Sequence, residues 1–281
     1  MNRSFLSPVA PTFARAVTIG VMAVSACLAS AAAHAEDSLT KMRNAGVIRI
    51  ANTQSTPPWS MLGVDNRPEG YDVAVAQELA KRLKIAKVVF VADSFKNFVE
   101  GLKTGKYDLV MNDLTPTAER EKQIDFAAPY GVEQFRIFVR NESRIASRAD
   151  LAGKSVGVTT GSSNEAWAKA NLKDSTIKSY ENGALVFSDL AIGRVDSVII
   201  SHFGGLKYAN VNHLPVKEVG EPLTYQLSAP ALAKGQPELK QAVTYAIQSM
   251  INDGTLANIS KRWVGADYDM VGSIEIAKKE Q

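Results

Sequence analysis

The stretch Leu109–Tyr130, LVMNDLTPTAEREKQIDFAAPY, decides how the rest of the chain is interpreted. It opens with Leu109-Val110-Met111, an apolar run typical of a buried strand. Polar residues follow, and then Pro116, which cannot donate to a strand ladder, so the strand must end here. Thr117 is placed to cap a short helix that carries Arg120 in its first turn.

Arg120 is an unusual residue for that position. The first turn of a helix carries partial positive charge and favours acids, a preference that Glu119 and Glu121 satisfy. A bound anion would explain the cation, because helix starts offer free N–H groups and a guanidinium grips a carboxylate with two parallel bonds. The alternatives are a solvated arginine or an ion pair with Asp125 or Glu121.

Composition excludes several classes of function. The chain has 281 residues, of which 46% are hydrophobic and 22% charged, as is ordinary for a soluble globular protein with one large or two modest domains. The formal net charge is +3, and no basic run or arginine–aromatic interleaving suggests a nucleic-acid partner. No metal cluster, nucleophile elbow or phosphate loop is evident, so we expect no metal and no cofactor.

Residues 1–35 predict a secretory signal peptide. Arg3 and Arg15 supply positive charge, a small apolar stretch follows, and Ala33-His34-Ala35 fits the A-x-A cleavage pattern. Removing these two arginines, the only charged residues of the leader, leaves a net charge of +1. The alternative of a transmembrane anchor is disfavoured, because the apolar run is short and ends at a cleavage signal.

A second alternative is lipoprotein cleavage before Cys27, within the sequence Val24-Ser25-Ala26-Cys27. Leu28 argues against it, because a small or polar residue usually follows the lipidated cysteine. We therefore expect a soluble periplasmic protein whose single cysteine is removed with the leader, which excludes disulfides, thiolate metal sites and cysteine catalysis.

An alternation of strands and helices follows the leader. Strands are predicted at 47–51, 88–91 and 109–111, and helices at 71–83 and 95–102. This order indicates a parallel sheet covered by helices, and such sheets bind ligands outside the carboxyl ends of their strands. The loops at 52–59 and 112–117 both follow strands and are expected on that rim.

A second α/β series begins at Phe135–Val139. The strand 155–158 runs into a turn at Thr159–Asn164 and then a helix at Glu165–Leu172, capped by Ser162, Ser163 or Asn164. This turn is a second candidate anion site, with an ordinary helix cap as the alternative. Further on, the pattern predicts a strand at 196–200 that reaches Ser201-His202, a strongly amphipathic helix at 239–251, and a frayed tail from Ser273.

Three motifs resemble a known family. T-P-T-A-E-R at 115–120, I-D-F-A-A-P-Y at 124–130 and D-G-T-L-A-N-I-S-K-R-W at 253–263 are similar to the bacterial family 3 solute-binding proteins, the polar amino-acid receptors of ABC importers. The resemblance covers nearly all of the chain after residue 36. It implies binding of a small amino-acid-like ligand, delivery to an ABC permease in the inner membrane, and a monomeric receptor.

The resemblance also implies the fold. We expect an α/β, two-lobe periplasmic-binding-protein fold of type II, each lobe a mostly parallel sheet flanked by helices, with two hinge strands. Lobe 1 would comprise residues 36–132 and 226–281, and lobe 2 residues 133–225, with the crossovers near 132–135 and 224–226. A solute that touches both lobes would stabilise closure about the hinge.

The family's site can be carried over residue by residue. The resemblance implies that Arg120 and Thr115 hold the solute's carboxylate from lobe 1, and that Ser163 with its neighbours Ser162 and Asn164 holds it from lobe 2. Phe95 falls on one of two aromatic platforms, although packing against Phe98 is nearly as good an explanation for it.

The aromatic site is incomplete in this sequence. Thr56 replaces the second aromatic platform, and Trp59 matches a family position that is more often structural. Thr53 replaces the acid that reads basic side chains in lysine, arginine and histidine receptors, which weakens any preference for a cationic side chain.

The most serious departure concerns the α-ammonium. Ser201 occupies the position of the lobe 2 aspartate that pairs with it, and a hydroxyl cannot neutralise an ammonium. We hypothesise that Asp113 supplies the charge, together with the Asn112 carbonyl; a lost charge-assisted bond would cost roughly 1.5–3 kcal/mol. The alternative is a ligand without an ammonium and an Asp113 that serves another polar group.

The sequence thus predicts a periplasmic, non-enzymatic receptor for a small carboxylate-bearing solute, with a polar amino acid preferred. One rival is a receptor for a non-amino organic acid or opine-like solute. The other is a cyclohexadienyl dehydratase-like enzyme, in which His202 and Asp113 would form an acid–base pair. The residues predicted to bind the ligand are Thr56, Trp59, Phe95, Asn112, Asp113, Thr115, Arg120, Ser162, Ser163, Asn164, Ser201 and His202.

Overall fold

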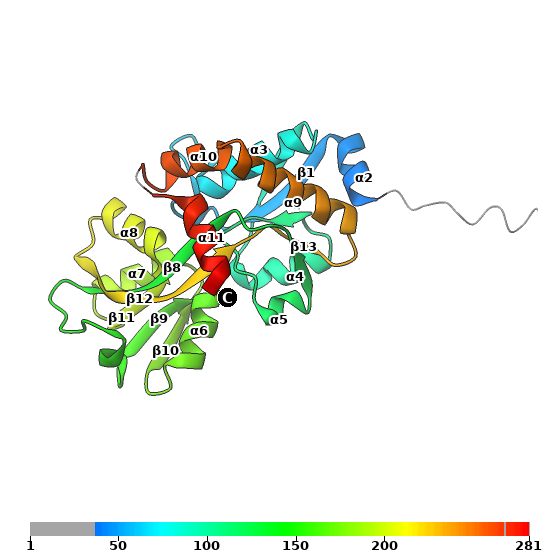
Figure 1. Ribbon diagram of the computed structural model, residues 1–281. Coiled ribbons are helices and arrows are strands. Elements are labelled where there is room, and N and C mark those ends of the chain that lie inside the picture. Colours follow the sequence, from blue (N-terminus) through cyan, green and yellow to red (C-terminus); the bar gives the residue numbers. More distant parts are fainter. Residues whose placement is uncertain (1–36, 267, 281) are drawn as a thin grey trace, which may run out of the picture. The chain divides into compact units, whose positions relative to one another are not determined.

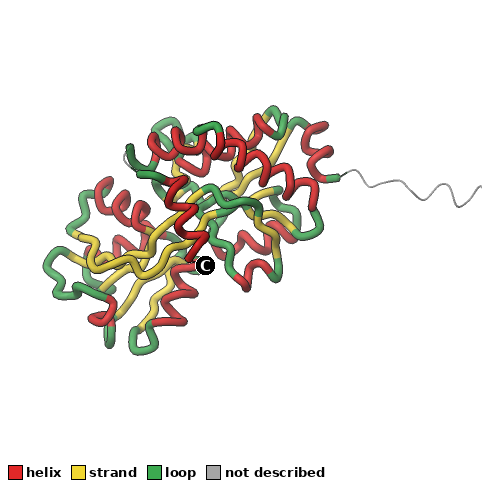
Figure 2. The backbone as a smooth tube through the Cα atoms, in the orientation of Figure 1, coloured by secondary structure: helices red, strands yellow, loops and turns green. Residues whose placement is uncertain are grey.

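The computed structural model describes residues 37–266 and 268–280, and residues 38–281 form one compact unit. The predicted signal peptide, with Cys27 and Ala35, lies outside the described residues. The compact unit contains two five-stranded sheets with helices packed around them (Figure 1, Figure 2). We call the part built on the sheet that contains Leu109 lobe 1, and the part built on the other sheet lobe 2.

The lobe 1 sheet confirms the expected parallel core. Its strand order is β5 (Lys87–Ala92), β1 (Val47–Asn52), β6 (Leu109–Val110), β13 (Ala231–Ala233) and β7 (Ile124–Phe126). Strand β1 pairs in parallel with β5 and β6, whereas β13 pairs antiparallel with β6 and β7. The helices of lobe 1 are α2 (Ser38–Ala45), α3 (Tyr71–Arg82), the 3-10 turn η1 (Phe95–Asn97), α4 (Phe98–Lys103), α5 (Ala118–Glu121), α9 (Pro237–Asn252), α10 (Thr255–Trp263) and α11 (Met270–Glu280).

Alternation along β1 explains why helices cover both faces of this sheet. Ile48 and Ile50 are fully buried in the cluster that contains α3 and α9, while Ala51 belongs to the cluster under α4. The predicted loop at 52–62 is only partly a loop. It contains β2 (Ser55–Thr56) and β3 (Ser60–Leu62), which pair with β4 (Pro68–Glu69) in a small antiparallel sheet.

Lobe 2 repeats the parallel arrangement. The strand order is β10 (Thr176–Tyr180), β9 (Ser155–Thr159), β11 (Ser197–Ser201), β8 (Gly131–Arg140) and β12 (Val216–Ser228), with the first three parallel. Its helices are η2 (Arg148–Leu151), α6 (Ser163–Asn171), α7 (Gly183–Ala191) and α8 (His202–Val211). Helix α6 begins two residues earlier than predicted, so Ser162 is its cap and Asn164 lies in its first turn.

Helix α8 is an element that sequence periodicity does not reveal. It contains Gly204 and Gly205, which lower helix propensity and leave a weak apolar pattern. The packing explains Gly205, because a Cβ at this position would lie 2.1 Å from the Phe138 ring of β8. The close approach of α8 to the sheet therefore requires glycine, although glycine is a poor helix-forming residue.

The two lobes are joined through β8 and β12, which pair antiparallel over most of their length. At one end of this ribbon, Val132 and Leu227 are buried in the lobe 1 core, and at the other Ile137 and Val139 are buried in lobe 2. The predicted crossovers at 132–135 and 224–226 are paired with one another in the ribbon. The lobe boundaries at 132/133 and 225/226 stay a prediction.

The prediction of a frayed tail from Ser273 is wrong. Residues 270–280 form α11, which lies across β8 and β12 (Figure 1). Met270, Ile274 and Ala277 are each about 1% exposed and join the lobe 1 core. The backbone N–H of Val132 also points to the Met270 sulfur at 3.4 Å. The tail is ordered because one face of it is buried against the hinge strands.

We expect Ile274→Ala to lower the free energy of unfolding by about 2–5 kcal/mol, because it leaves a cavity between α11 and the hinge strands. Ile276→Ala, on the same helix at a position that is 56% exposed, should change it by less than about 0.5 kcal/mol. Urea unfolding of both variants measures the difference. Equal losses would show that α11 is not packed as described.

Candidate functional site

Two loops at the carboxyl ends of β1 and β6 form the lobe 1 side of the site, as expected for a parallel sheet. Asn112 ties them together. Its Oδ1 accepts from the Thr53 backbone N–H at 2.7 Å and from Ser60 Oγ at 2.7 Å, and its side chain is fully buried. Asn112 therefore fixes the positions of the loops, and the structure does not bring its carbonyl to a cavity surface.

Arg120 crosses from lobe 1 to lobe 2. Thr117 Oγ1 caps α5 by accepting the Arg120 backbone N–H at 3.3 Å, as predicted. The guanidinium donates from Nη1 to the Thr115 carbonyl at 2.7 Å and from Nη2 to the Gly161 carbonyl of lobe 2 at 2.8 Å. Within residues 37–266 and 268–280 no carboxylate forms an ion pair with it. The predicted alternative, a pair with Asp125 or Glu121, is not formed.

Burial lowers the pKa of Arg120 to about 10, against the opposing charges of Glu119 and Asp113. The guanidinium is still charged at neutral pH. A half-buried cation that donates only to neutral carbonyls remains electrostatically unbalanced, and an anionic group would stabilise it. This arrangement supports anion binding at Arg120, although α5 is a single turn of four residues and contributes little helix dipole.

The lobe 2 turn at 159–164 lies directly opposite Arg120. Gly161 adopts φ +76°, and a Cβ there would lie 2.8 Å from the Lys96 Cα of lobe 1. Only glycine allows both the backbone conformation and this close approach. Ser163 Oγ lies 3.1 Å from Thr115 Oγ1, so the two predicted carboxylate-binding hydroxyls meet across the lobes.

Part of the predicted anion cradle in this turn is already occupied by the chain itself. The Gly161 backbone N–H donates to Glu165 Oε2 at 2.6 Å, and Ser162 Oγ donates to the Thr159 carbonyl at 2.6 Å. Ser162 Oγ also accepts the Glu165 backbone N–H at 3.2 Å, which makes it the cap of α6. The ordinary-cap interpretation therefore holds for Ser162, and Ser163 is the hydroxyl directed toward lobe 1.

A small cavity lies between the lobes next to Arg120. Its volume is about 40 Å³, and it receives side chains from both lobes. Half of the predicted ligand-binding residues line it, namely Thr56, Phe95, Asp113, Ser162, Asn164 and Ser201. The other lining residues are Thr53, Thr159, Glu181, Asn182, Gly183, Ile200 and Tyr208.

A groove of about 410 Å³ adjoins this cavity, because Phe95 and Ser162 line both. Arg120 and Ser163 line the groove, whereas Asp113 and Asn164 line the cavity. Phe95 thus lines both the groove that contains the basic group and the cavity that contains the acidic group. Phe95 also packs on Phe98 at 5.3 Å between ring centroids, so both interpretations of this residue are compatible with the structure.

Three carboxyl groups close to the hinge strands have neutral hydrogen-bond donors, and of these Asp72 and Glu133 are buried whereas Asp113 is half-buried. Ser228 Oγ donates to Asp113, Tyr130 Oη donates to Asp72 at 2.8 Å, and Trp59 Nε1 donates to Glu133 at 2.9 Å. None of the three forms an ion pair with a lysine, arginine or histidine of the described chain. A carboxyl held only by neutral donors in a buried place favours its protonated form.

The pKa values reflect this burial. Desolvation raises the pKa of Asp113 well above its ordinary value, opposed by the Ser228 hydrogen bond, and the charge of Asp72 adds to the rise while Arg120 counteracts it. Burial also raises the pKa of Glu133, with a further rise from the charge of Asp113. Burial raises the pKa of Asp72 to about 7, against the hydrogen bond from Tyr130.

Two predicted residues lie away from the cavity. Trp59 is fully buried against Tyr71, with ring centroids 5.2 Å apart, and donates to Glu133. His202 Nδ1 lies 2.6 Å from Glu218 Oε2, and Glu218 also pairs with Arg136. The proposed acid–base pair of His202 with Asp113 is therefore not formed, because Glu218 on β12 holds the imidazole.

Several site residues were missed. Tyr208 reaches the cavity from α8 and donates to the Ser55 carbonyl across the lobes, and α8 itself was not predicted. Glu133 is 1% exposed at the centre of the hinge, beside the predicted crossover, and only its charge in an apolar hinge strand could have marked it. Glu181 forms a cross-lobe ion pair with Lys96 at 2.6 Å.

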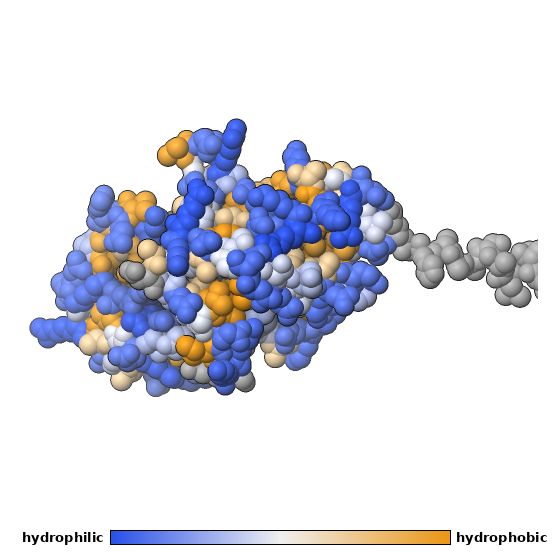
Figure 3. Space-filling view, turned by 45° about the horizontal axis from the view of Figure 1, so that its top comes forward, coloured by the Kyte–Doolittle hydropathy of each residue, from blue (hydrophilic) through white to orange (hydrophobic). Residues whose placement is uncertain are grey.

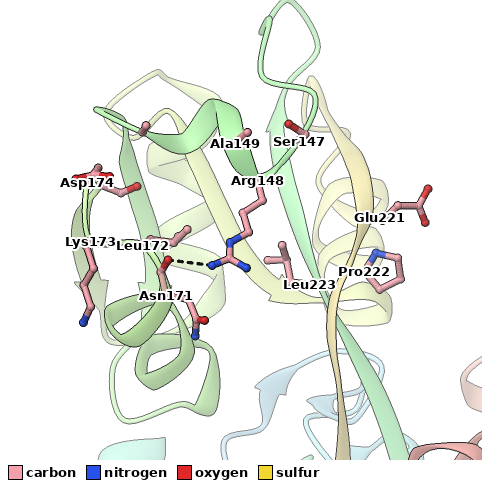
Figure 4. A pocket seen from close by; sticks show the side chains of 12 residues that line it. Ser147, Arg148, Ala149, Asn171, Leu172, Lys173, Asp174, Glu221, Pro222 and Leu223 are labelled. Atoms are coloured by element: carbon pink, nitrogen blue, oxygen red, sulfur yellow. Dashed lines mark hydrogen bonds between the residues drawn. The ribbon is translucent and has the colours of Figure 1, made fainter. Parts of the chain in front are cut away.

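A larger hollow lies elsewhere, on lobe 2. It has a volume of about 660 Å³ and lies between η2, the end of α6 and the β12 bulge (Figure 4). Arg148 projects into it and donates to the Asn171 carbonyl at 3.1 Å. None of the predicted ligand-binding residues lines this hollow, and all of its lining residues belong to lobe 2. Size alone therefore does not identify the solute site.

Arg120 and the turn at 159–164 meet across the two lobes, which share a small cavity and a hinge ribbon. This arrangement is that of a two-lobed binding protein rather than a single rigid scaffold. The profile of the bacterial extracellular solute-binding proteins, family 3, matches residues 48–266, and the chain belongs to this family. The described residues contain no helix that is long and apolar enough to cross a bilayer.

Known proteins agree with this assignment. The L-cystine-binding protein TcyJ of Escherichia coli K12 is 31% identical over 257 residues, covering 90% of this chain and 96% of TcyJ. A cysteine-binding protein from Campylobacter jejuni has a similar structure, with TM-score 0.78, 26% identity, and coverage of 84% and 97%. The ancestral amino-acid-binding protein AncCDT-1, a precursor of cyclohexadienyl dehydratase, gives TM-score 0.74, 31% identity, and coverage of 81% and 99%.

We expect Asp72→Asn to stabilise the protein at neutral and higher pH. Because the folded pKa of about 7 exceeds the ordinary 3.8, stability from this group is complete below about pH 4 and is lost as pH rises through 7. The variant should therefore exceed the wild type by up to about 4 kcal/mol above pH 7 and match it near pH 4.

Thermal unfolding across this pH range measures the difference, with Asp65→Asn in the exposed β3–β4 hairpin as the control. Asp65 is 58% exposed and should show no such pH dependence. A variant that is less stable than the wild type at pH 8 would show that Asp72 is needed as a carboxylate.

Proposed function

We propose that this chain is a periplasmic receptor that binds a small α-amino acid with an uncharged side chain and delivers it to an ABC permease. The observation that carries the proposal is Arg120, a charged guanidinium that reaches from lobe 1 to lobe 2 and binds only neutral carbonyl groups there. A ligand carboxylate at this point would touch both lobes, and a ligand that contacts both stabilises their closure by its differential affinity.

Two observations support an uncharged ligand side chain. Thr53 lines the cavity at the place where an acid would read a basic side chain, and its Oγ1 is bonded to Thr56 Oγ1 at 2.6 Å. The acid that does reach the cavity rim, Glu181, is neutralised by Lys96 at 2.6 Å. A cationic ligand side chain would therefore find no free carboxylate there, apart from Asp113.

Asp113 is the proposed partner of the ligand's ammonium. It lines the cavity from lobe 1, its hydrogen-bond donor is the neutral Ser228 hydroxyl, and Phe95 lines both this cavity and the groove that contains Arg120. The names of the cystine- and cysteine-binding relatives fit this assignment. The proposal also includes export to the periplasm by cleavage after Ala35, and a monomeric state.

The rival binding function is a receptor for a non-amino organic acid, which the neutral Ser201 would favour. The rival enzyme is a dehydratase, which the similarity to a dehydratase precursor brings into consideration. The proposal excludes catalysis, because the histidine that such an acid–base pair would need is held by Glu218.

The first test is a thermal-shift panel of the proteinogenic amino acids, L-cystine and the corresponding 2-hydroxy acids. Bound ligand raises the melting temperature by mass action. We expect at least one amino acid to give a shift that Arg120→Ala abolishes without loss of folding. Arg67→Ala, which removes an arginine that is 85% exposed, should keep the shift.

Retained affinity in Arg120→Ala would place the site elsewhere, and shifts from hydroxy acids alone would favour the organic-acid receptor. A cyclohexadienyl acid is included in the panel. Appearance of an aromatic product's absorbance would contradict the non-enzymatic proposal.

We expect the affinity for the amino acid to rise as the pH increases above the ordinary range of an aspartate carboxyl. Asp113 has a raised pKa, so it must give up its proton before it can pair with an ammonium, and binding releases that proton. Asp113→Asn should weaken binding about 10–100-fold at pH 8 and remove the pH dependence. Calorimetric titration at several pH values measures both effects; an affinity that falls with pH would contradict the role of Asp113.

A further inference from the structure

The carboxamide of Asn164 is an unexplained polar group in the cavity between the lobes. Asn164 lies in the first turn of α6, is only 8% exposed and lines the cavity. Its Oδ1 is buried and has no hydrogen-bond partner within the described chain. Leaving such an acceptor unpaired costs roughly 1–3 kcal/mol, so a buried carbonyl of this kind is normally satisfied.

Two other groups in this cavity can also accept hydrogen bonds. Asp113 lies on the lobe 1 side with its carboxylate, and Ser201, which is 4% exposed, contributes a hydroxyl from the lobe 2 strand β11. No lysine, arginine or histidine of residues 37–266 and 268–280 lines the cavity. Two acceptors from opposite lobes thus face a space to which the described chain brings no cation.

The Asp113 carboxylate, the Asn164 carbonyl and the Ser201 hydroxyl together indicate which ligand group would bind between them. An ammonium group carries three N–H donors and no acceptor, so it can bond to a carboxylate, an amide carbonyl and a hydroxyl at once. A hydroxyl or a carboxylate of the ligand would leave Asn164 Oδ1 or the Asp113 charge unsatisfied. An N-methylated ammonium has fewer N–H donors and would leave one of these three acceptors unpaired, so the set favours a primary ammonium.

We propose that Asn164 is the lobe 2 acceptor for the ligand's primary ammonium, and that it forms an ammonium subsite with Asp113 and Ser201. This inference rests on the proposed function of the chain as an amino-acid receptor. The carboxamide adds a second lobe 2 acceptor beside the Ser201 hydroxyl, and it lies on α6, which also carries Ser163. Closure then places Asn164 and Asp113 on either side of one ammonium, which selects primary amino acids over hydroxy acids and N-methylated analogues.

The test compares Asn164→Leu, which removes the acceptor at similar size, with Asn164→Asp, which keeps an acceptor oxygen and adds charge. The probes are the L-amino acid that shifts the wild-type melting temperature most, its 2-hydroxy acid and its N-methyl derivative. Asn171→Leu, at the exposed end of the same helix, is the control. Dissociation constants are measured by calorimetry, and melting temperatures without ligand verify folding.

We expect Asn164→Leu to weaken binding of the amino acid about 10–100-fold and to change the affinity for the hydroxy acid by no more than about threefold. The ratio of the two affinities should therefore become smaller. Asn164→Asp should bind the amino acid at least as well as the wild type, and the N-methyl derivative should bind the wild type poorly. Wild-type affinity in Asn164→Leu, equal losses for both acids, or weaker binding in Asn164→Asp than in Asn164→Leu would each overturn the inference. If no amino acid raises the melting temperature of the wild type, the proposed function itself is contradicted. The thermal-shift panel shows this before any Asn164 variant is made.

Discussion

The position of one cation governs the site. Arg120 is half-buried, and this partial loss of hydration lowers its pKa to about 10, yet it retains its charge and donates to carbonyl oxygens of both lobes at 2.7 and 2.8 Å. A buried charge needs either a counter-charge or a set of oriented dipoles. Here the chain supplies only the dipoles. A bound anion would therefore neutralise the charge of Arg120. The contact of Arg120 with Gly161 requires the two lobes to come together.

The hinge carries the opposite electrostatic feature. Asp72, Asp113 and Glu133 are carboxyl groups with neutral donors as recorded partners, close to the ribbon of β8 and β12. Protonation lowers the free-energy cost of holding these carboxyl groups without charged partners in the folded state. A bound ammonium would replace a proton at Asp113. The exposed surface is different in character, with mainly hydrophilic residues and separate apolar patches in the view of Figure 3. The unusual charges are thus concentrated inside, at the site.

The sequence predicts the parts of this molecule that rest on strong local patterns. The strands at 47–52, 87–92 and 109–110 and helix α3 follow from periodicity, and Arg120 is marked by being a cation in a helix start that favours acids. The missed parts depend on contacts distant in sequence. Helix α8 is hidden by two glycines, of which packing against Phe138 requires Gly205, and α11 looked like a tail because its apolar residues are buried only by contact with the hinge strands. His202 could not be distinguished from a cleft residue, because its partner Glu218 lies on the hinge strand 16 residues away.

The most direct test of the central claim is a crystal structure of the protein with the amino acid that stabilises it most. The account predicts the carboxylate within hydrogen-bond distance of the Arg120 guanidinium and the Ser163 hydroxyl, with the ammonium near Asp113. An amino acid bound in the lobe 2 hollow beside Arg148, or bound between the lobes with its carboxylate away from Arg120, would contradict it.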